Sequence, residues 1–397
     1  MNFLEKLLDG VAVEWKSFGE VAKVQRGASP RPISKFITDD ENGIPWIKIG
    51  DTSPNSKYVE NTEQKITPEG ATKSRILKKG DFIMSNSMSF GRPYILNIDG
   101  AIHDGWASIS GFGDRLNADY LYHYLSSDLV QDYWISKINS GSVSNLNSDI
   151  IKSLEIPIPP LAIQAEIVRI LDTFTALTAE LTAELTDRKK QYNYYRDRLL
   201  TFEEGEAEWK TLGEIGAILR GTAITEKEAN LGDYPVVANG PSHNYFHDQS
   251  NRSGETIVIA RSGVYAGLVS YWDIPIFLTD AFSIHPDNNA LSTKFLYYVL
   301  KKDQIKIHNM SKGAGVPHVR AKDFESYKVP VPPLEEQARI VAILDKFDTL
   351  TTSIREGLPR EIALRQKQYE YYRDLLLTFP KPEEVEAHLN SMEKSHG

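Results

Sequence analysis

IPIPPLAIQAEIVRILDTFTALT, residues 156–178, returns almost word for word as VPVPPLEEQARIVAILDKFDTLT, residues 329–351. A second block also occurs twice, as KKQYNYYRDRLLTF (189–202) and RQKQYEYYRDLLLTF (365–379). The second copy is longer by four residues, and the difference falls beside the sequence TAELTAEL (178–185). A repeat of this length within one chain predicts two copies of one structural unit.

Weaker repeats precede each copy and divide the rest of the chain. EWKSFGEVAKVQRG (14–27) resembles EWKTLGEIGAILRG (208–221), and between these anchors the two halves diverge almost freely. The sequence therefore predicts a variable globule and a constant segment, each occurring twice. The expected parts are an N-terminal segment (1–12), a first globule (13–156), a central helical spacer (157–207), a second globule (208–329) and a C-terminal helical region with a tail (330–397).

The constant segments are expected to be long helices. Each begins after a Pro-Pro pair, and proline ends a strand and permits a helix to start. Apolar residues then follow at alternating steps of four and three, at 163, 167, 170, 174, 177 and 181, and nearly the same spacing recurs from Ile340. This spacing is typical of a coiled-coil seam, so each segment is expected to pair with the other. Gly357 and Pro359 predict a break in the second copy; ordinary amphipathic core helices are the alternative interpretation.

The globules have the pattern of mixed α/β domains. Short runs rich in Val, Ile and Tyr alternate with Gly, Asn, Asp and Pro, and one helix is expected in each globule, over 118–133 and 293–307. We read Trp15 and Trp209, in the repeated EWK sequence, as structural residues.

Polar and basic residues gather in certain loops at similar places in both globules. Arg, Lys, Asn, Ser and His are the side chains that bind base edges and phosphates, and the loops carrying them are candidates for contacting nucleic acid. For any one residue, a solvated loop position is the alternative. The candidates are Arg26, Arg31, Lys48, Ser85, Asn86, Arg92, Ser142, Asn145, Arg220, Asn239, His243, Asn244, Arg261, Ser262, Lys312, His318 and Arg320.

Composition limits the possible classes of protein. The chain has 397 residues and no cysteine, so disulfides and thiolate chemistry are excluded. We find no signal peptide and no apolar run long enough for a membrane span, and therefore expect a cytoplasmic protein. The net charge is −9, yet residues 13–156 carry 16 basic and 18 acidic side chains and residues 208–329 carry 13 of each. The acidity lies mostly outside the globules, which leaves room for a local basic face on each.

Searches for catalytic motifs find none. There is no GxxxxGK[ST] phosphate loop and no His-Glu-x-x-His, and the Pro-Pro pairs are followed by leucine rather than by the aromatic residue of an amino-methyltransferase. His243 and His247 have a spacing that metal ligands can have, but only Asp248 stands near them, so we expect no metal. These patterns predict a non-catalytic binding module for a two-part target.

The chain resembles the specificity subunit of type I restriction-modification enzymes over essentially its whole length. The resemblance is carried by PPLAIQAEIVRILD (159–172), PPLEEQARIVAILDKFDTLT (332–351), the paired QYxYYRD sequences and TAELTAEL, which is characteristic of one branch of that family. It implies two α/β target-recognition domains separated by two long antiparallel, coiled-coil-like helical regions, in a pseudo-two-fold symmetric arrangement.

The resemblance also implies partners. Each domain would read half of a bipartite double-stranded DNA target, and the helical regions would dock two methyltransferase subunits that bind S-adenosylmethionine and flip an adenine. Restriction and translocation would belong to motor subunits that use ATP and Mg²⁺, and this chain would carry no cofactor. The helical positions that match the family are Leu161, Gln164, Ile167, Tyr192, Tyr195, Arg196, Leu334, Gln337, Tyr369, Tyr372 and Arg373.

The repeated TAEL word has a geometric interpretation. Four residues lengthen a helix by about 6 Å and turn its end by about 400°. One base pair of DNA adds about 3.4 Å and roughly 34–36° of twist. We therefore expect each word to correspond to one base pair of the gap between half-sites; slippage in a repetitive gene, without effect on function, is the alternative. For the chain as a whole, the alternatives are a stand-alone DNA-binding regulator and an autonomous enzyme.

Overall fold

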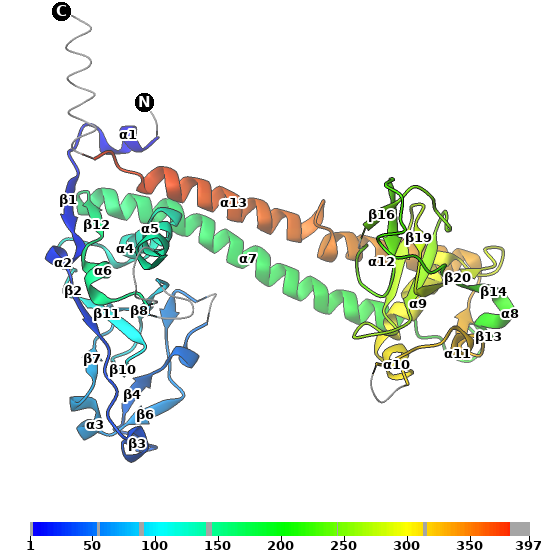
Figure 1. Cartoon of the computed structure of the whole chain (residues 1–397), viewed down its shortest axis with the longest axis horizontal. Helices are drawn as coiled ribbons and strands as arrows, with labels where there is room; N and C mark the ends of the chain where they lie inside the picture. Colours follow the sequence, from blue (N-terminus) through cyan, green and yellow to red (C-terminus); the bar gives the residue numbers. More distant parts are fainter. Residues whose placement is uncertain are drawn as a thin grey trace, which may run out of the picture. The chain divides into compact units, whose positions relative to one another are not determined.

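The structure, a computed structural model, describes residues 3–53, 56–86, 91–139, 145–243, 245–312 and 316–381. The chain forms two compact units, unit 1 from residues 1–180 with 363–397 and unit 2 from residues 181–362. Each unit combines β-sheets with parts of long helices (Figure 1). This is the mixed α/β fold that the sequence predicts. The division between units falls inside two helices, and the five-part organisation expected from the repeat stays a prediction.

Unit 1 contains two five-stranded sheets and a two-stranded ribbon. Their orders are β2-β11-β8-β9-β5, β3-β6-β4-β10-β7 and β1-β12. The strands are β1 (Glu14–Ser17), β2 (Lys23–Arg26), β3 (Ile37–Thr38), β4 (Ile44–Ile47), β5 (Tyr58–Val59), β6 (Gln64–Ile66), β7 (Arg75–Leu77), β8 (Phe82–Ser85), β9 (Pro93–Leu96), β10 (Gly100–Ile102), β11 (Trp106–Ser110) and β12 (Glu155–Ile158).

Unit 2 has a matching set of sheets. Their orders are β14-β20-β17-β18, β16-β15-β19 and β13-β21. The strands are β13 (Glu208–Thr211), β14 (Gly216–Arg220), β15 (Tyr234–Val237), β16 (Tyr245–His247), β17 (Thr256–Ala260), β18 (Val269–Trp272), β19 (Phe277–Leu278), β20 (Ala281–Pro286) and β21 (Lys328–Val331). In both units an antiparallel ribbon joins the repeated EWK strand to the strand before the Pro-Pro pair.

Each expected globule helix is in fact two helices. Unit 1 has α4 (Ala118–Leu125) and α5 (Asp128–Asn139), and unit 2 has α9 (Thr293–Lys302) and α10 (Gln304–Asn309). The prediction of one helix each was wrong because the chain turns at the junctions: Ser127 Oγ donates to the Tyr124 carbonyl at 2.7 Å, and Asp303 serves as the C-cap of α9 and the N-cap of α10. The short helices are α1 (Phe3–Leu8), α2 (Phe18–Val21), α3 (Pro68–Thr72), α6 (Ser148–Lys152), α8 (Leu212–Ile215) and α11 (Ala321–Glu325).

The constant segments form three long helices. α7 (Leu161–Leu199) is uninterrupted and contains both TAEL words, whereas the second copy forms α12 (Leu334–Thr352) and α13 (Gly357–Leu377). The predicted break is confirmed, since Gly357 has a φ of +80° that residues with a Cβ rarely adopt. Within the described ranges, no helix has the combination of length and apolarity that crossing a membrane requires.

The helices pack on the globules of their own units. Ile167 and Leu171 of α7 are fully buried in the core of unit 1, together with Leu376 and Leu377 of α13. Ile340 and Leu344 of α12 are buried in the same way in unit 2. Part of the expected coiled-coil seam is therefore a helix-to-globule contact.

One buried glutamine ties the start of each constant helix to its globule. In unit 1 the Asn117 N–H donates to Gln164 Oε1 at 2.8 Å, and Gln164 Nε2 donates to the carbonyls of Arg115 at 2.9 Å and Pro159 at 2.7 Å. In unit 2 Gln337 makes the equivalent bonds with the Ser292 N–H and with the carbonyls of Ala290 and Pro332, at 2.8–2.9 Å. Both side chains are fully buried, so each amide satisfies three backbone groups that water does not reach.

Replacing either glutamine by leucine is expected to destabilise its unit. Gln164→Leu leaves one N–H and two carbonyls without partners, at a cost of about 2–4 kcal/mol, and Gln337→Leu does the same in unit 2. Urea unfolding followed by circular dichroism measures the change. Gln191→Leu, at an exposed position of α7, is the matched control and is expected to shift the free energy of unfolding by less than about 0.5 kcal/mol. Equal stability of all three variants would contradict the role of the buried amides.

Candidate functional site

Three backbone segments meet at one edge of the main sheet in each unit. In unit 1 the first segment is the end of β2 at Arg26, the second is Asn86, which follows β8, and the third precedes α6. The third segment contacts the second, because the Leu146 N–H donates to the Asn86 carbonyl at 3.2 Å. In unit 2 the Val319 N–H donates to the Arg261 carbonyl at 2.8 Å. The same interaction therefore holds the same two segments together in both units.

The strand register shows which residue of unit 1 is equivalent to which residue of unit 2. Arg26 lies opposite Ala107, which lies opposite Met84; Arg220 lies opposite Phe282, which lies opposite Ile259. Met84 and Ile259 are therefore equivalent, and two residues further along the chain Asn86 corresponds to Arg261. Because the N–H groups of the residues after Asn145 and His318 bind the carbonyls of Asn86 and Arg261, Asn145 corresponds to His318. We call these positions the three-segment edge: Arg26, Asn86 and Asn145 in unit 1, and Arg220, Arg261 and His318 in unit 2.

The edge of unit 1 surrounds a polar hollow of about 290 Å³. Its lining includes Arg26, Asn86 and Asn145 together with residues 146–149. Arg26 Nε donates to the Asp104 carbonyl at 3.3 Å, and the rest of this exposed guanidinium faces solvent. In the described part of the chain, the Asn86 and Asn145 side chains have no hydrogen-bond partner. The hollow thus offers donors and acceptors that are available to a ligand.

The edge of unit 2 is held by a hydrogen-bond network. Asn239 Oδ1 accepts from the N–H groups of Arg261 at 2.6 Å and Ser262 at 3.1 Å, and Asn239 Nδ2 donates to Asp280 at 2.6 Å. Arg261 forms an ion pair with Asp280 at 3.2 Å, while about half of its side chain stays exposed. Backbone bonds between Lys312 and His318 close the third segment. The guanidinium of Arg261 is therefore aimed from a fixed loop.

A second, larger hollow of about 650 Å³ lies beside the first in unit 1 and includes Arg31, Lys48 and His103. Asp104 organises its rim, because Ser29 Oγ donates to it at 2.8 Å and Arg31 forms an ion pair with it at 3.3 Å. Burial alone would raise the pKa of Asp104, but the Ser29 hydrogen bond and the nearby cations hold that pKa below its usual value. Sequence analysis did not select Asp104 or Asp280, since a single Asp in a loop carries no pattern.

The remaining candidates lie in varied surroundings. Ser85 is almost fully buried within β8, which does not fit direct contact of its side chain with a ligand. Arg92 lies over the Tyr94 ring at 5.7 Å, Arg320 precedes α11 and pairs with Asp323, and the His243 ring is 4.7 Å from that of Phe246. Ser142 and Asn244 lie outside the described residues.

The long helices carry an aromatic stack that is the same in both units. In unit 1 Phe174 of α7 stacks on Tyr372 of α13 with ring centroids 5.2 Å apart, and Tyr371 meets Tyr372 edge-on at 5.3 Å. In unit 2 Phe347 stacks on Tyr195 at 5.7 Å, and Tyr194 meets Tyr195 edge-on, also at 5.3 Å. Tyr371 and Tyr194 are 63% and 59% exposed. These outward tyrosines belong to the repeated QYxYYRD sequences and are exposed at the same place in both units, although they are not among the helical positions that the sequence selected individually.

Tyr369, one of the helix residues singled out by the sequence, makes its contacts inside the chain. His123, nearly fully buried, has its ring nitrogens 2.8 Å from Asp172 Oδ1 and 3.0 Å from the Tyr369 hydroxyl. The hydrogen bond with His123 lowers the pKa of Asp172, and burial raises the pKa of Tyr369 to about 12. In unit 2 the residue equivalent to Asp172 is Asp345, which accepts from the Tyr298 hydroxyl.

The other helix positions divide into buried and exposed groups. Arg373 is buried, with an ion pair to Asp128 at 2.9 Å, whereas Arg196 pairs with the adjacent Asp197 at 2.8 Å. Tyr192 is partly buried against the unit 2 core, and burial raises its pKa to about 12. Leu161 and Leu334 are about half exposed at the helix starts. Docking by these residues stays a prediction.

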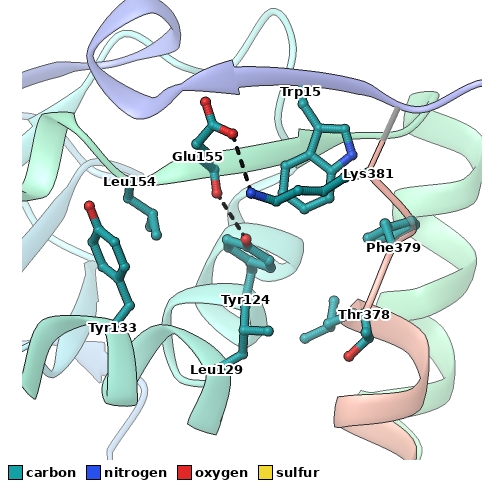
Figure 2. A pocket seen from close by; sticks show the side chains of 10 residues that line it. Trp15, Tyr124, Leu129, Tyr133, Leu154, Glu155, Thr378, Phe379 and Lys381 are labelled. Carbon is teal, nitrogen blue, oxygen red and sulfur yellow. Dashed lines mark hydrogen bonds and ion pairs between the residues drawn. The ribbon is translucent and has the colours of Figure 1, made fainter. Parts of the chain in front are cut away.

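An apolar hollow in unit 1 is lined by residues of β1 and of the segment that follows α13. Figure 2 shows Trp15 of β1 beside Phe379 and Lys381, which follow α13. Trp15 Nε1 donates to the Pro380 carbonyl at 3.2 Å, and Lys381 pairs with Glu155 at 3.5 Å. The expectation of a structural Trp15 fits these contacts. Trp209, at the same place in β13, is 55% exposed, and a structural role for it stays a prediction.

Comparison with known proteins decides the family. The sequence matches the type I restriction modification DNA specificity domain twice, over residues 11–188 and 205–364. The chain belongs to this family. A type I specificity subunit is a non-catalytic subunit, and the fold, with two sheet-rich units and long helices, is that of its structural neighbours.

Relatives of this specificity subunit match along their full length. The specificity subunit of the Escherichia coli type I restriction enzyme EcoR124I/EcoR124II is 38% identical, with 97% of this chain and 99% of the relative covered. A putative type I specificity subunit of Haemophilus influenzae is 33% identical, with 95% and 98% covered. The alternative of a stand-alone regulator is not favoured.

Solved structures agree on the fold. A chain from a study of complex assembly and conformational transition of the type I R-M system matches with a TM-score of 0.66 and 17% identity, covering 92% of this chain and 98% of the other. The S subunit of a type I restriction-modification system from M. genitalium matches with a TM-score of 0.58 and 18% identity, covering 94% and 98%.

Proposed function

We propose that this specificity subunit reads a bipartite double-stranded DNA target, with one half-site bound by each unit. The observation that carries the proposal is the three-segment edge, which recurs at equivalent backbone positions, with the side chain different at two of the three positions. Equivalent positions give two domains the same approach to a duplex, and different side chains give them different sequences to select. The membership of the chain in the specificity family supports the same conclusion.

The chemistry is assigned to partner subunits. Two methyltransferase subunits would bring S-adenosylmethionine, and restriction motor subunits would bring ATP and Mg²⁺. Within the described ranges, no group of three or more His, Cys, Asp or Glu side chains is arranged to hold a metal ion. The complex would work in the cytoplasm, on DNA.

Two copies of one methyltransferase subunit would need the same binding surface in both units. The docking residues should therefore be identical and similarly exposed in the two units. Tyr194 and Tyr371 are identical, equally exposed, and held in the same edge-on geometry by the tyrosine that follows each. Exposed tyrosine on a rigid helix provides a large contact area with little loss of side-chain entropy. Leu161 and Leu334, at the helix starts, are a second pair of identical residues that are about half exposed.

The TAEL words would set the gap between half-sites, as expected for the family branch that carries them. Both words lie inside the uninterrupted helix α7, with Leu177, Leu181 and Leu185 half buried and most of the other side chains exposed. Because one word adds slightly more than one helical turn, removing it keeps the leucines nearly in line while shortening the helix.

Co-expression with the methyltransferase subunit of the same system tests the proposed function. We expect single-base mapping of N6-methyladenine across the host DNA to give an asymmetric two-part motif with a fixed unspecified gap. Cells with the methyltransferase alone are the control and should lack the motif. Methylation without a gapped motif, from a complex that contains this chain, would refute the proposal.

Deleting Thr182–Leu185 is expected to shorten the gap of the methylated motif by one base pair, with both half-sites unchanged. The reason is that four residues shorten the helix by about 6 Å and change its twist by about 40° beyond a full turn. Glu184→Gln keeps the helix length and is the matched control, so its gap should equal that of the wild type. An unchanged gap after the deletion would favour repeat slippage without function.

Single variants Tyr194→Ala and Tyr371→Ala are each expected to weaken the binding of one methyltransferase subunit by about thirtyfold, the effect of losing a tyrosine hot spot. Native mass spectrometry should then show loss of one partner copy from each single variant and of both from the double variant. Tyr58→Ala, at another exposed tyrosine of unit 1, is the control. Unchanged stoichiometry in the double variant, at concentrations near the wild-type Kd, would exclude this docking surface.

A further inference from the structure

The three positions of the edge differ in how they vary between the units. Arg26 and Arg220 are the same residue at the same place, at the ends of β2 and β14. Asn86 is replaced by Arg261, and Asn145 by His318. If both units bind the same kind of duplex, a shared residue suits a feature common to both half-sites, and a changed residue suits a feature that differs.

The shared arginines are suited to a phosphate. Both are exposed, and Arg26 is oriented through its Nε bond to the Asp104 carbonyl, which leaves the remaining guanidinium N–H groups free. In the described part of the chain, the Arg220 side chain has no ion-pair or hydrogen-bond partner. Arginine binds phosphate with a planar fork of donors, and phosphates are present along every DNA sequence.

Asn86 and Arg261 have the side chains that distinguish purines. An asparagine amide offers one donor and one acceptor to adenine at N6 and N7, whereas an arginine offers two donors to guanine at O6 and N7. The backbone of each residue is fixed, because the Asn86 N–H donates to the Gly105 carbonyl at 3.1 Å and the Arg261 N–H donates to Asn239. A fixed backbone aims the side chain at one position.

We propose a division of roles within the edge: Arg26 and Arg220 bind DNA phosphates, whereas Asn86 and Arg261 read the corresponding base pair of their two half-sites. The inference rests on the proposed DNA-reading function and adds the residues and their chemistry. Asn86 selects adenine and Arg261 selects guanine. Asn145 and His318, which also differ, lie next to the base-reading residue in each unit.

Exchanging the two side chains is the decisive experiment. The variants Asn86→Arg and Arg261→Asn are each co-expressed with the methyltransferase subunit, and the methylated motif is mapped. Asn86→Arg is expected to change one adenine of one half-site to guanine, and Arg261→Asn one guanine of the other half-site to adenine. Each preference should change by at least about fivefold, as for one bidentate contact. The opposite half-site and the gap stay as in the wild type.

Charge-matched controls separate readout from net charge. Asn61→Arg adds the same charge at an exposed loop position of unit 1, and Lys227→Asn removes one at an exposed position of unit 2. Both should give the wild-type motif. If an exchange variant yields no methylation, Asn86→Ala and Arg261→Ala test the base-reading role instead. Each alanine variant should relax the preference to any base at the same single position.

The phosphate role has its own measurement. Arg26→Ala and Arg220→Ala complexes are titrated with the wild-type duplex and with a duplex changed at the base read by Asn86 or Arg261, over a series of salt concentrations. Both duplexes should lose affinity by the same factor, and the slope of log K against log salt should fall by about one.

The outcomes separate the inference from the proposed function. A bipartite wild-type motif that neither the exchange nor the alanine variants alter overturns the inference and leaves the function standing. A changed base preference in Arg26→Ala or Arg220→Ala also overturns the division of roles. Absence of any bipartite motif from the wild-type complex removes the proposed function itself.

Discussion

The amide of one buried glutamine joins the constant and variable parts of each unit, and the remaining architecture depends on it. Gln164 and Gln337 each bind one N–H and one carbonyl of the segment that leads into α4 or α9, and one carbonyl of the Pro-Pro turn. A buried amide with three satisfied bonds permits a single placement of the helix start on the globule. The helix axis and the sheet edge are thereby fixed with respect to one another within each unit.

Each unit has two kinds of surface, which differ in whether their side chains are the same in both units. The helix surface presents identical residues in both units, Leu161 and Leu334 at the starts and Tyr194 and Tyr371 toward the ends. The sheet edge presents three positions that are equivalent in backbone, and the side chain differs at two of them. One kind of surface suits a component present twice, and the other suits two different DNA sequences. Under the proposed function, assembly and recognition therefore lie on separate elements.

Much of this arrangement was predictable because it is written in local pattern. The Pro-Pro pairs predicted where the long helices start, Gly357 predicted the break in the second copy, and the internal repeat predicted two similar units. The parts that were missed depend on contacts between distant residues. The junctions between α4 and α5 and between α9 and α10 lie inside apolar patterns that read as single helices. The exposure of Tyr371, the burial of Ser85 and the positions of Asp104 and Asp280 follow from strand register and packing, which no short motif encodes.

The acidic residue that ends the Ile-Leu-Asp sequence of each constant helix has a different partner in each unit. Asp172 meets an imidazole, His123, and Asp345 meets a phenol, Tyr298, although the two carboxylates hold the same place in the repeat. A carboxylate accepts from either group without any change in the helix. The same helix position therefore accepts two different donors, so the two globules differ at this place without any change in the helix.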